Sequence, residues 1–414
     1  MARQPVTDLL WPGDHRAGDL MSAAALLDAM LAVEAAWSAA LIDRGIAPEA
    51  SRVDQRLLAG LLDENDHQTV AVGAEDAGNP VVPLVRLLRD RLGAEEAPSR
   101  WLHRGLTSQD VLDTALMTCA RDAVGVIRAE VRVQIGLLCG LVERYRRTEM
   151  VARTLGQHAV PTTFGLKAGH WLNGVLDVLE DLERATFPVQ FGGAAGTLAA
   201  TVELAESLPS PVEAATGAAE VAADLLGLAP SLPWHGVRTP VTRIGDLAVR
   251  CTDAWGHVAN DVIALSRPEI AEVREGVGGG SSTMPHKSNP VLSVLVRRAA
   301  IAAPPLASTL HIAAADSTDE RSAGAWHVEW ATLRTLTRRT VVAGSQTTDL
   351  LRALHIDEER MATTLSAASG VRSEQQTMAA LTGHEPAATY VGASDAFIDA
   401  ALVRARAALS EADR

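Results

Sequence analysis

The chain has 414 residues, 47% hydrophobic and 21% charged, so it is long enough for two or three domains and can bury a large core. Only 3% of the residues are aromatic, which argues against an all-β sandwich or barrel because strands favour aromatic and β-branched residues. The 37 basic and 51 acidic residues give a formal net charge of −14, so we expect no nucleic-acid partner, whereas a small anionic ligand remains compatible.

Apolar residues recur at helical spacing along most of the chain, and no alternating strand pattern of useful length is present. The longest such run, 107–148, opens with Thr107 and Asp110 at the spacing of a capping box and would span roughly 60 Å. The pattern predicts helices over residues 23–45, 80–93, 107–148, 163–185, 240–267, 290–313, 321–353 and 358–370.

The three cysteines, Cys119, Cys139 and Cys251, cannot all pair and form no CxxC motif. The first twenty residues lack the apolar core of a secretory signal. No uncharged apolar run approaches the roughly 18 residues that a membrane span needs. We therefore expect reduced thiols, no membrane partner and a cytoplasmic location.

The most unusual stretch is 276–290, GVGGGSSTMPHKSNP, in which three adjacent glycines precede serines, a histidine and a lysine. Consecutive glycines are costly in helices and strands and indicate a loop. The stretch does not match a phosphate-binding loop or a dinucleotide fingerprint, because His286 and Ser281 stand where those motifs need glycine. No spacing of cysteines and histidines indicates a metal site.

Residues 280–290, GSSTMPHKSNP, resemble the GSSxMPxKxNP motif of the fumarase/aspartase/argininosuccinate lyase superfamily. Two further motifs follow the expected order: residues 103–110 resemble HxxxTSxD, and residues 154–161, TLGQHAVP, resemble the histidine-bearing second motif. The resemblance implies an all-α fold with a long central helical bundle. Its expected domains are a small N-terminal helical domain (1–105), the central bundle (106–353) and a shortened C-terminal helical segment (354–414).

Within the superfamily, the sequence most resembles the 3-carboxy-cis,cis-muconate cycloisomerase branch. The stretches that carry this resemblance are residues 77–85, 190–198, 233–235, 320–322 and 326–330. The C-terminal end departs from the family pattern. A full helical C-terminal domain would be expected after about residue 371, but only 43 residues follow, so most of that domain is missing. This departure puts the closure of the active site, and with it the substrate, in question.

The resemblance implies reversible β-elimination beside a carboxylate, with Ser281 as general base and Ser282 as the adjacent candidate. Lys287 and Asn289 would stabilise the dianionic aci-carboxylate, and His158 would act as an acid or would position the substrate. A carboxylate leaving group needs no proton, which favours the positioning role in a lactone-opening reaction. The resemblance further implies that substrate carboxylates are bound by His103, Thr107, Ser108, Gln109, Ser282, Thr283, Met284, Arg321 and Ser322, with His235, Arg238 and His327 as further possibilities.

Three hypotheses follow from these residues. The first is a cofactor-free and metal-free cycloisomerase acting on 3-carboxy-cis,cis-muconate in aromatic catabolism. The second is a lyase that releases fumarate, or an analogue, from a substituted succinate such as an N-substituted aspartate or nitrosuccinate. The third is a non-catalytic scaffold of the same fold. In each case the resemblance implies a homotetramer, in the first two with sites shared between subunits and a di- or tricarboxylate substrate.

Overall fold

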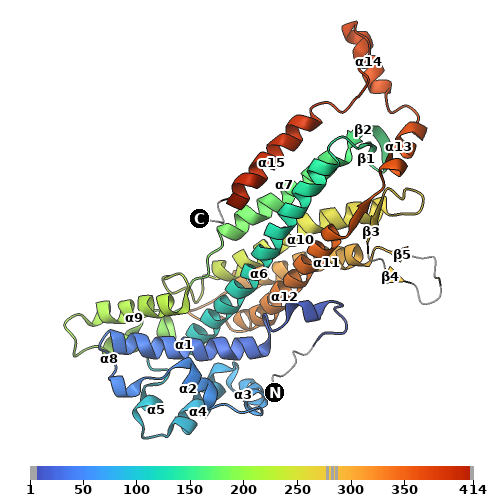
Figure 1. Cartoon of the computed structure of the whole chain (residues 1–414). Coiled ribbons are helices and arrows are strands. Elements are labelled where there is room, and N and C mark those ends of the chain that lie inside the picture. The colour runs from blue at the N-terminus through green and yellow to red at the C-terminus, as the bar shows by residue number, and fades with distance from the viewer. Residues whose placement is uncertain (1–6, 277–278, 281–283, 285–287, 411–414) are drawn as a thin grey trace.

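The computed structural model describes residues 7–276, 279–280, 284 and 288–410. These residues form an elongated and mostly helical molecule, with long helices running side by side through its middle (Figure 1). The predicted all-α class is therefore confirmed. The long helices are α6 (Ser108–Arg144), α7 (Phe164–Glu183), α10 (Thr239–Leu265), α11 (Val291–Ala315) and α12 (Ala325–Arg352).

The bundle is built by packing apolar faces, as the helical periodicity predicts. Helix α6 packs against α7 and α12, while α11 packs against α10 and α12. Along α6 the apolar side chains that face the core, such as Val111, Ile127 and Ile135, are almost completely buried. Burial of this kind contributes about 1.5–3 kcal/mol for each large aliphatic side chain.

One end of the bundle is covered by the N-terminal part of the chain. Helix α1 (Ala23–Asp43) lies across this end and packs against α6 and α9 (Pro211–Leu226) (Figure 1). The buried Trp37 of α1 stacks on Phe191, with ring centroids 5.0 Å apart. The shorter helices near this end are α2 (Gln55–Gly60), α3 (Asp66–Ala77), α4 (Val81–Leu92), α5 (Ala97–Trp101) and α8 (Ala199–Leu204).

Helices α1 and α11 are long and apolar enough to cross a membrane, judged by length and composition alone. In the folded chain, α1 packs against α9 and α6, and α11 packs against α10 and α12. Such helices also occur in the cores of soluble proteins, so their composition is weak evidence for a membrane span.

The opposite end carries short strands that the sequence pattern did not predict. Hairpin β1 (Glu149–Thr154)–β2 (Gln157–Thr163) turns at Leu155 and Gly156, which have φ of 52° and 81°. Two positive φ values are what a tight two-residue hairpin requires, and glycine at the second position was the available sequence signal. The other strands are β3 (Val273–Glu275), paired with β6 (Leu354–Ile356), and β4 (Gly279–Gly280), paired with β5 (Ser288–Asn289).

The C-terminal part of the chain contains α13 (Glu358–Ala367), α14 (Ser373–Thr382) and α15 (Ser394–Ser410). Helix α14 projects beyond the bundle, whereas α15 returns along α7 (Figure 1). Arg404 holds α15 in place by ion pairs to Asp177 and Glu180 of α7. The division of the chain into three domains stays a prediction.

The predicted helix over 321–353 was wrong at its N-terminal boundary. Gly324 has a φ of 83°, a conformation that favours glycine and interrupts the helix, and α12 begins at Ala325. Arg321 and Ser322 consequently lie in the loop before α12 rather than on its surface. This loop brings Arg321 to the N-terminus of α6.

The cysteines are free thiols, with Cys119 and Cys251 buried and Cys139 half-buried. Burial raises the pKa of Cys119 to about 12, and it also raises the pKa of Cys139. A thiol with a raised pKa carries little thiolate at neutral pH, so these side chains are unreactive packing groups.

Candidate active site

The first motif lies at the N-terminus of α6, where the predicted capping box forms. The backbone N–H of Thr107 donates to Asp110 Oδ2 at 2.9 Å. The buried Asp110 carboxylate also accepts from the backbone N–H groups of Gly192 and Gly193 and from Gln190 Nε2, each at 2.9–3.0 Å. Asp110 therefore fixes the loop around residue 192 against the start of the helix.

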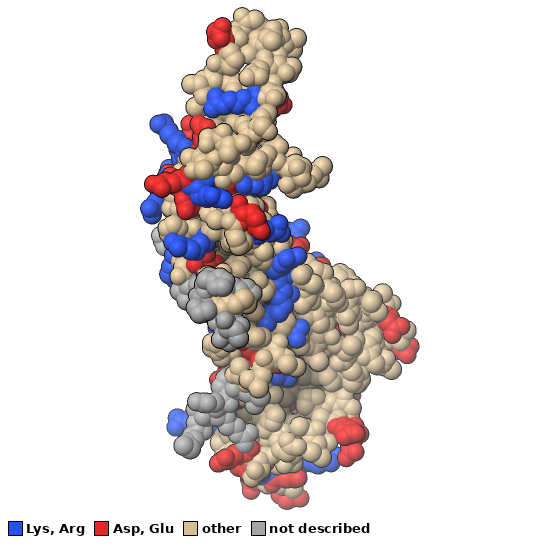
Figure 2. Space-filling view, turned by 90° about the vertical axis from the view of Figure 1, so that its right-hand side faces the viewer, with Lys and Arg blue, Asp and Glu red and all other residues tan. Residues whose placement is uncertain are grey.

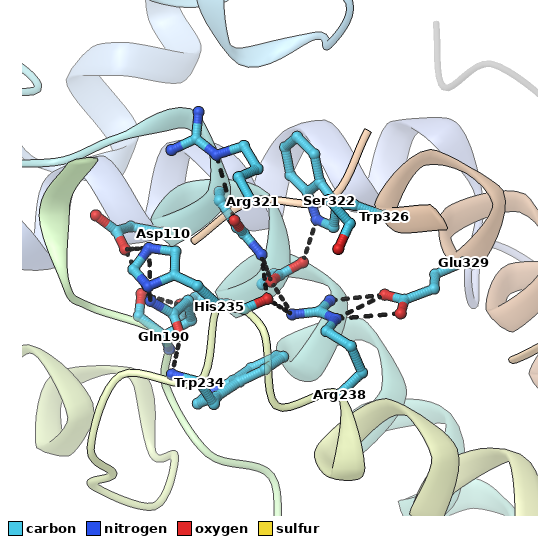
Figure 3. Close-up of polar contacts among 12 residues, drawn as sticks. Asp110, Gln190, Trp234, His235, Arg238, Arg321, Ser322, Trp326 and Glu329 are labelled. Atoms are coloured by element: carbon cyan, nitrogen blue, oxygen red, sulfur yellow. Dashed lines mark hydrogen bonds and ion pairs between the residues drawn. The ribbon is translucent and has the colours of Figure 1, made fainter. Parts of the chain in front are cut away.

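Arg321 reaches the same helix terminus from the loop before α12 (Figure 3). Its Nη2 donates to Thr107 Oγ1 at 2.5 Å, and its Nε donates to Gln109 Oε1 at 3.3 Å. Both acceptors are neutral, and within the described ranges no carboxylate lies close enough to form an ion pair with Arg321. A helix N-terminus and an uncompensated guanidinium together form a site for an anion.

Ser108 and Gln109 are buried next to this terminus rather than exposed to solvent. The Gln109 amide donates to Asp113 Oδ2 and to the backbone carbonyl of His235, both at 3.1 Å. Its carbonyl oxygen accepts from Arg321, so Gln109 connects the guanidinium to the protein interior. Gln109 thus orients Arg321 in this conformation.

Ser322 is also buried and acts within its own loop. Its hydroxyl lies 2.7 Å from that of Ser317 and accepts from the backbone N–H of Thr318 at 3.1 Å. These bonds close a turn just ahead of α12. Ser322 therefore shapes the loop that carries Arg321.

Arg238, a possible substrate ligand by the resemblance, instead forms the centre of a buried network (Figure 3). Its Nη1 donates to Asp113 Oδ2 at 2.8 Å, and its Nη2 donates to Glu329 Oε2 at 2.7 Å. Burial alone would lower the pKa of Arg238, but the two carboxylates outweigh it and raise that pKa. Arg238 is only 3% exposed and fully engaged, so it supports the site instead of contacting a ligand.

His235 lies in the same network, with both ring nitrogens 3.2 Å from Gln190 Nε2. Gln190 also accepts from the backbone N–H of Trp234 through its Oε1, at 2.6 Å. The packing is close, because a Cβ at Gly192 would lie 2.5 Å from the His235 ring. The glycine pair at 192–193 was the sequence signal for this tight approach.

His103 lies just before the helix, at a φ of 61°. Its Nδ1 is 2.6 Å from Oε1 of the buried Glu34, on α1. Burial alone would lower the pKa of His103, but Glu34 outweighs it and the pKa of the imidazole is raised. The structure therefore brings His103, Thr107, Gln109 and Arg321 to one end of the bundle.

His158 lies at the other end of the molecule. It is exposed on β2, opposite Arg153 of β1, and Arg153 forms a two-pronged ion pair with the buried Glu272 at 2.8–2.9 Å. The 37 residues of α6 run between the first motif and this hairpin, which corresponds to roughly 55 Å. One chain therefore does not bring His158 to Thr107 and Arg321.

Two short described parts of the glycine-rich segment, Gly279–Gly280 and Ser288–Asn289, pair with each other, and this paired stretch is called the neck. Gly279 pairs with Asn289, and Gly280 pairs with Ser288. A Cβ at Gly279 would clash with the Val291 side chain, so a larger residue here would force Val291 to move. Met284 is 40% exposed and Asn289 is half-buried, while the predicted residues Ser281, Ser282, Thr283 and Lys287 lie outside the described residues.

The neck is anchored by Glu275, which directly precedes the segment. Its carboxylate accepts from the backbone N–H groups of Leu292 and Ser293 at 3.1 and 2.7 Å, and from the Ser293 hydroxyl at 2.6 Å. These N–H groups belong to the first turn of α11, where a negative charge is favourable. Glu275 thereby joins the two ends of the segment, next to a cavity of about 290 Å³ that Asn289 lines.

Basic side chains gather along the middle of the face in Figure 2, so the net negative charge is not spread evenly over the surface. Among the described residues, no group of three or more His, Cys, Asp and Glu side chains could hold a metal ion. The groups at this end that could bind an anion are Arg321, His103 and the α6 N-terminus.

Comparisons with known proteins identify the family of the chain. A family model described as lyase matches residues 19–303. The chain is 40% identical to the nitrosuccinate lyase of Streptomyces davaonensis over 369 residues, which covers 87% of this chain and 77% of that protein. It is 36% identical to the 3-carboxy-cis,cis-muconate cycloisomerase of Bradyrhizobium diazoefficiens over 390 residues, or 92% of this chain and 82% of that protein.

A solved structure shares the fold. The crystal structure of the 3-carboxy-cis,cis-muconate lactonizing enzyme from Pseudomonas putida superposes with a TM-score of 0.80 at 28% sequence identity. The match covers 92% of this chain and 94% of that chain.

Proposed function

The chain belongs to the lyase family of the fumarase/aspartase superfamily and is an enzyme of that group, and from this premise we propose that it is a cycloisomerase. It interconverts 3-carboxy-cis,cis-muconate and a carboxymuconolactone in the cytoplasm, as a step of aromatic catabolism in the β-ketoadipate pathway. The observation that supports an anionic substrate is the environment of the Arg321 guanidinium. Among the described residues its partners are neutral: Thr107 and Gln109 at the α6 N-terminus and the Trp326 ring, 5.8 Å from the guanidinium carbon. A substrate carboxylate would supply the missing counter-charge.

In the lactone-forming direction, an internal carboxylate oxygen adds to a double bond and a proton is delivered to the carbon beside a second carboxylate. In reverse, Ser281 removes that proton as the C–O bond breaks and the carboxylate leaves. Lys287, Asn289 and the backbone N–H groups of the glycine segment stabilise the aci-carboxylate. His158 orients the substrate, because a carboxylate leaving group needs no proton.

We further propose that the active site is completed by other copies of the chain in a homotetramer. Support comes from the roughly 55 Å of α6 that separates the first motif from the His158 hairpin. Helix α11 also exposes Val294, Ile301 and Ile312, which are 50–66% accessible and spaced along one side of the helix. An exposed apolar stripe on a long bundle helix suits packing against another copy.

Mixing two inactive variants tests the shared site. Arg321→Ala and Ser281→Ala subunits, unfolded together and reassembled, would regain roughly a quarter of wild-type turnover if the two residues come from different subunits. Each variant alone would stay inactive. No recovery in a mixture shown by native mass spectrometry to contain mixed tetramers would contradict the proposal.

A second candidate is favoured by the 40% identity to a nitrosuccinate lyase. In that case the same base would remove a proton beside a carboxylate of a substituted succinate. A leaving group such as nitrite or an amine would depart from the neighbouring carbon, and fumarate would be released. The anion-binding residues would keep their roles, since both substrates carry at least two carboxylates.

One assay separates the candidates. Purified protein is mixed with 3-carboxy-cis,cis-muconate and the diene absorbance is followed. Unchanged absorbance at high enzyme concentration excludes the cycloisomerase, whereas fumarate released from nitrosuccinate or an N-substituted aspartate identifies the lyase. If none of these compounds is turned over, a non-catalytic scaffold is favoured.

A further inference from the structure

Glu34 and His103 form a nearly buried pair between two elements that lie far apart in the sequence. The side chain of Glu34 is 0% exposed and that of His103 is 16% exposed, and Oε1 lies 2.6 Å from Nδ1. The second carboxylate oxygen, Oε2, is buried without a hydrogen-bond partner in the described part of the chain. A carboxylate buried in this way needs nearby cations to offset the cost of removing its charge from water.

The backbone of His103 is held in place by its surroundings. Its φ of 61° is unfavourable for a residue with a side chain, so packing has to maintain it. The contact with Glu34 uses Nδ1. The other nitrogen, Nε2, makes no hydrogen bond within the described ranges, and the ring is partly accessible.

The charges that face the imidazole come from three helices. Glu34 on α1 and Asp110 on α6 favour its protonation, while Arg89 on α4 opposes it. Burial opposes protonation more than any other single factor, yet the pKa of His103 is raised. The raised pKa of His103 is therefore due mainly to Glu34, since removal of that charge leaves burial and Arg89 against Asp110 alone.

We propose that Glu34 is a positioning residue of the active site, which fixes His103 through Nδ1 and presents its cationic Nε2–H to a substrate carboxylate. The inference rests on the proposed function, because it assigns that carboxylate to the substrate. His103 and Arg321 then supply two positive charges at one helix N-terminus, as a molecule with two or more carboxylates requires. Glu34 contacts neither the substrate nor the reacting atoms and acts only through His103.

The test replaces the charge while keeping the shape, with Glu34→Gln. Glutamine Oε1 can still accept from Nδ1–H, but the pKa of His103, followed by ¹⁵N NMR of the ring, should fall by about one unit or more. The alkaline limb of kcat/KM should move to lower pH by the same amount. Between the two pKa values KM should rise up to about tenfold, with kcat changed far less.

Controls separate positioning from folding. Asp28→Asn, on the exposed side of the same helix, should leave the pKa of His103 and the pH profile unchanged. Glu34→Asp retains the charge and should restore most of the raised pKa, which distinguishes a lost charge from a misfolded site. The double variant Glu34→Gln/His103→Asn should bind substrate no more weakly than His103→Asn alone.

An unchanged pKa of His103 in Glu34→Gln overturns the proposal, and so does a lowered pKa without a change in KM. The NMR titration needs no turnover, so it distinguishes this inference from the proposed function. If the enzyme turns over neither substrate, the proposed function fails. The Glu34 assignment is then decided by the titration and by the binding of 3-carboxy-cis,cis-muconate to the two proteins.

Discussion

The two ends of the helical bundle contribute to the site in different ways. At the α6 N-terminus, Gln109, Arg238 and Glu329 are buried and bonded to one another or to their neighbours over long sequence separations. At the other end, His158 is exposed, and the Asn289 amide makes no hydrogen bond to a described residue. One end is organised within a single chain, whereas the other exposes the groups that the proposed tetramer would bring together with another copy.

The largest expected effect is a loss of turnover on substitution in the glycine-rich segment. Ser281→Ala should lower kcat by about 10³-fold, because it removes the proposed general base, without changing the mass measured by light scattering. Ser282→Ala is the matched comparison, since the two serines are adjacent candidates. A large loss in Ser282→Ala with wild-type turnover in Ser281→Ala would transfer the role.

The next largest effect is expected at the α6 N-terminal end, when Arg238 is removed from the buried network. In Arg238→Ala the carboxylates of Asp113 and Glu329 stay buried without their cation, so we expect a loss of about 3–5 kcal/mol of unfolding free energy. Urea unfolding at a fixed protein concentration measures it, with the exposed Arg56→Ala on α2 as control. A loss below about 1 kcal/mol would show that the network is not structural.

A smaller effect sharpens the assignment of Arg321. In Arg321→Lys the compact ammonium cannot contact Thr107 and Gln109 together and still offer a paired donor to a carboxylate. We expect KM to rise about tenfold, with a smaller change in kcat. Steady-state kinetics provide the measurement, and an unchanged KM would remove Arg321 from the binding site.

The smallest effect concerns stability against pH. Because the folded-state pKa of His103 is raised above its ordinary value of 6.5, its stabilising contribution is complete below that value and disappears as pH rises through the folded pKa. The Tm of the wild type should therefore exceed that of Glu34→Gln by more at pH 6 than at pH 9. Equal differences at the two pH values would contradict this linkage.

The helices were predictable because each has an apolar face of sufficient length. Periodicity located α1, α4, α6, α7, α10 and α11 to within a few residues, and Thr107 with Asp110 identified the cap of α6. The start of α12 was misplaced because a single glycine with positive φ overrides an otherwise helical pattern. The β1–β2 hairpin was missed because its strands are short and only half-buried.

The buried network could not be predicted, because its members come from distant parts of the sequence. Asp113 and Glu329 meet only through Arg238, and each would look like an ordinary helical surface charge in its own segment. Glu34 is a similar case, since its neighbour His103 is 69 residues away. The motif residues at the α6 N-terminus came from the resemblance, whereas the residues that hold them in place emerged only from the fold.

Helix α6 has a consequence for how such a chain can change during evolution. It acts as a spacer of fixed length. Losing one turn would shorten α6 by about 5 Å, and losing one residue would rotate the chain that follows by about 100° about the helix axis. In the proposed tetramer, either change would shift His158 away from the residues that neighbouring copies would contribute. Insertions and deletions should therefore collect in the loops and at the C-terminal end, while the 37-residue length of α6 stays constant among working relatives.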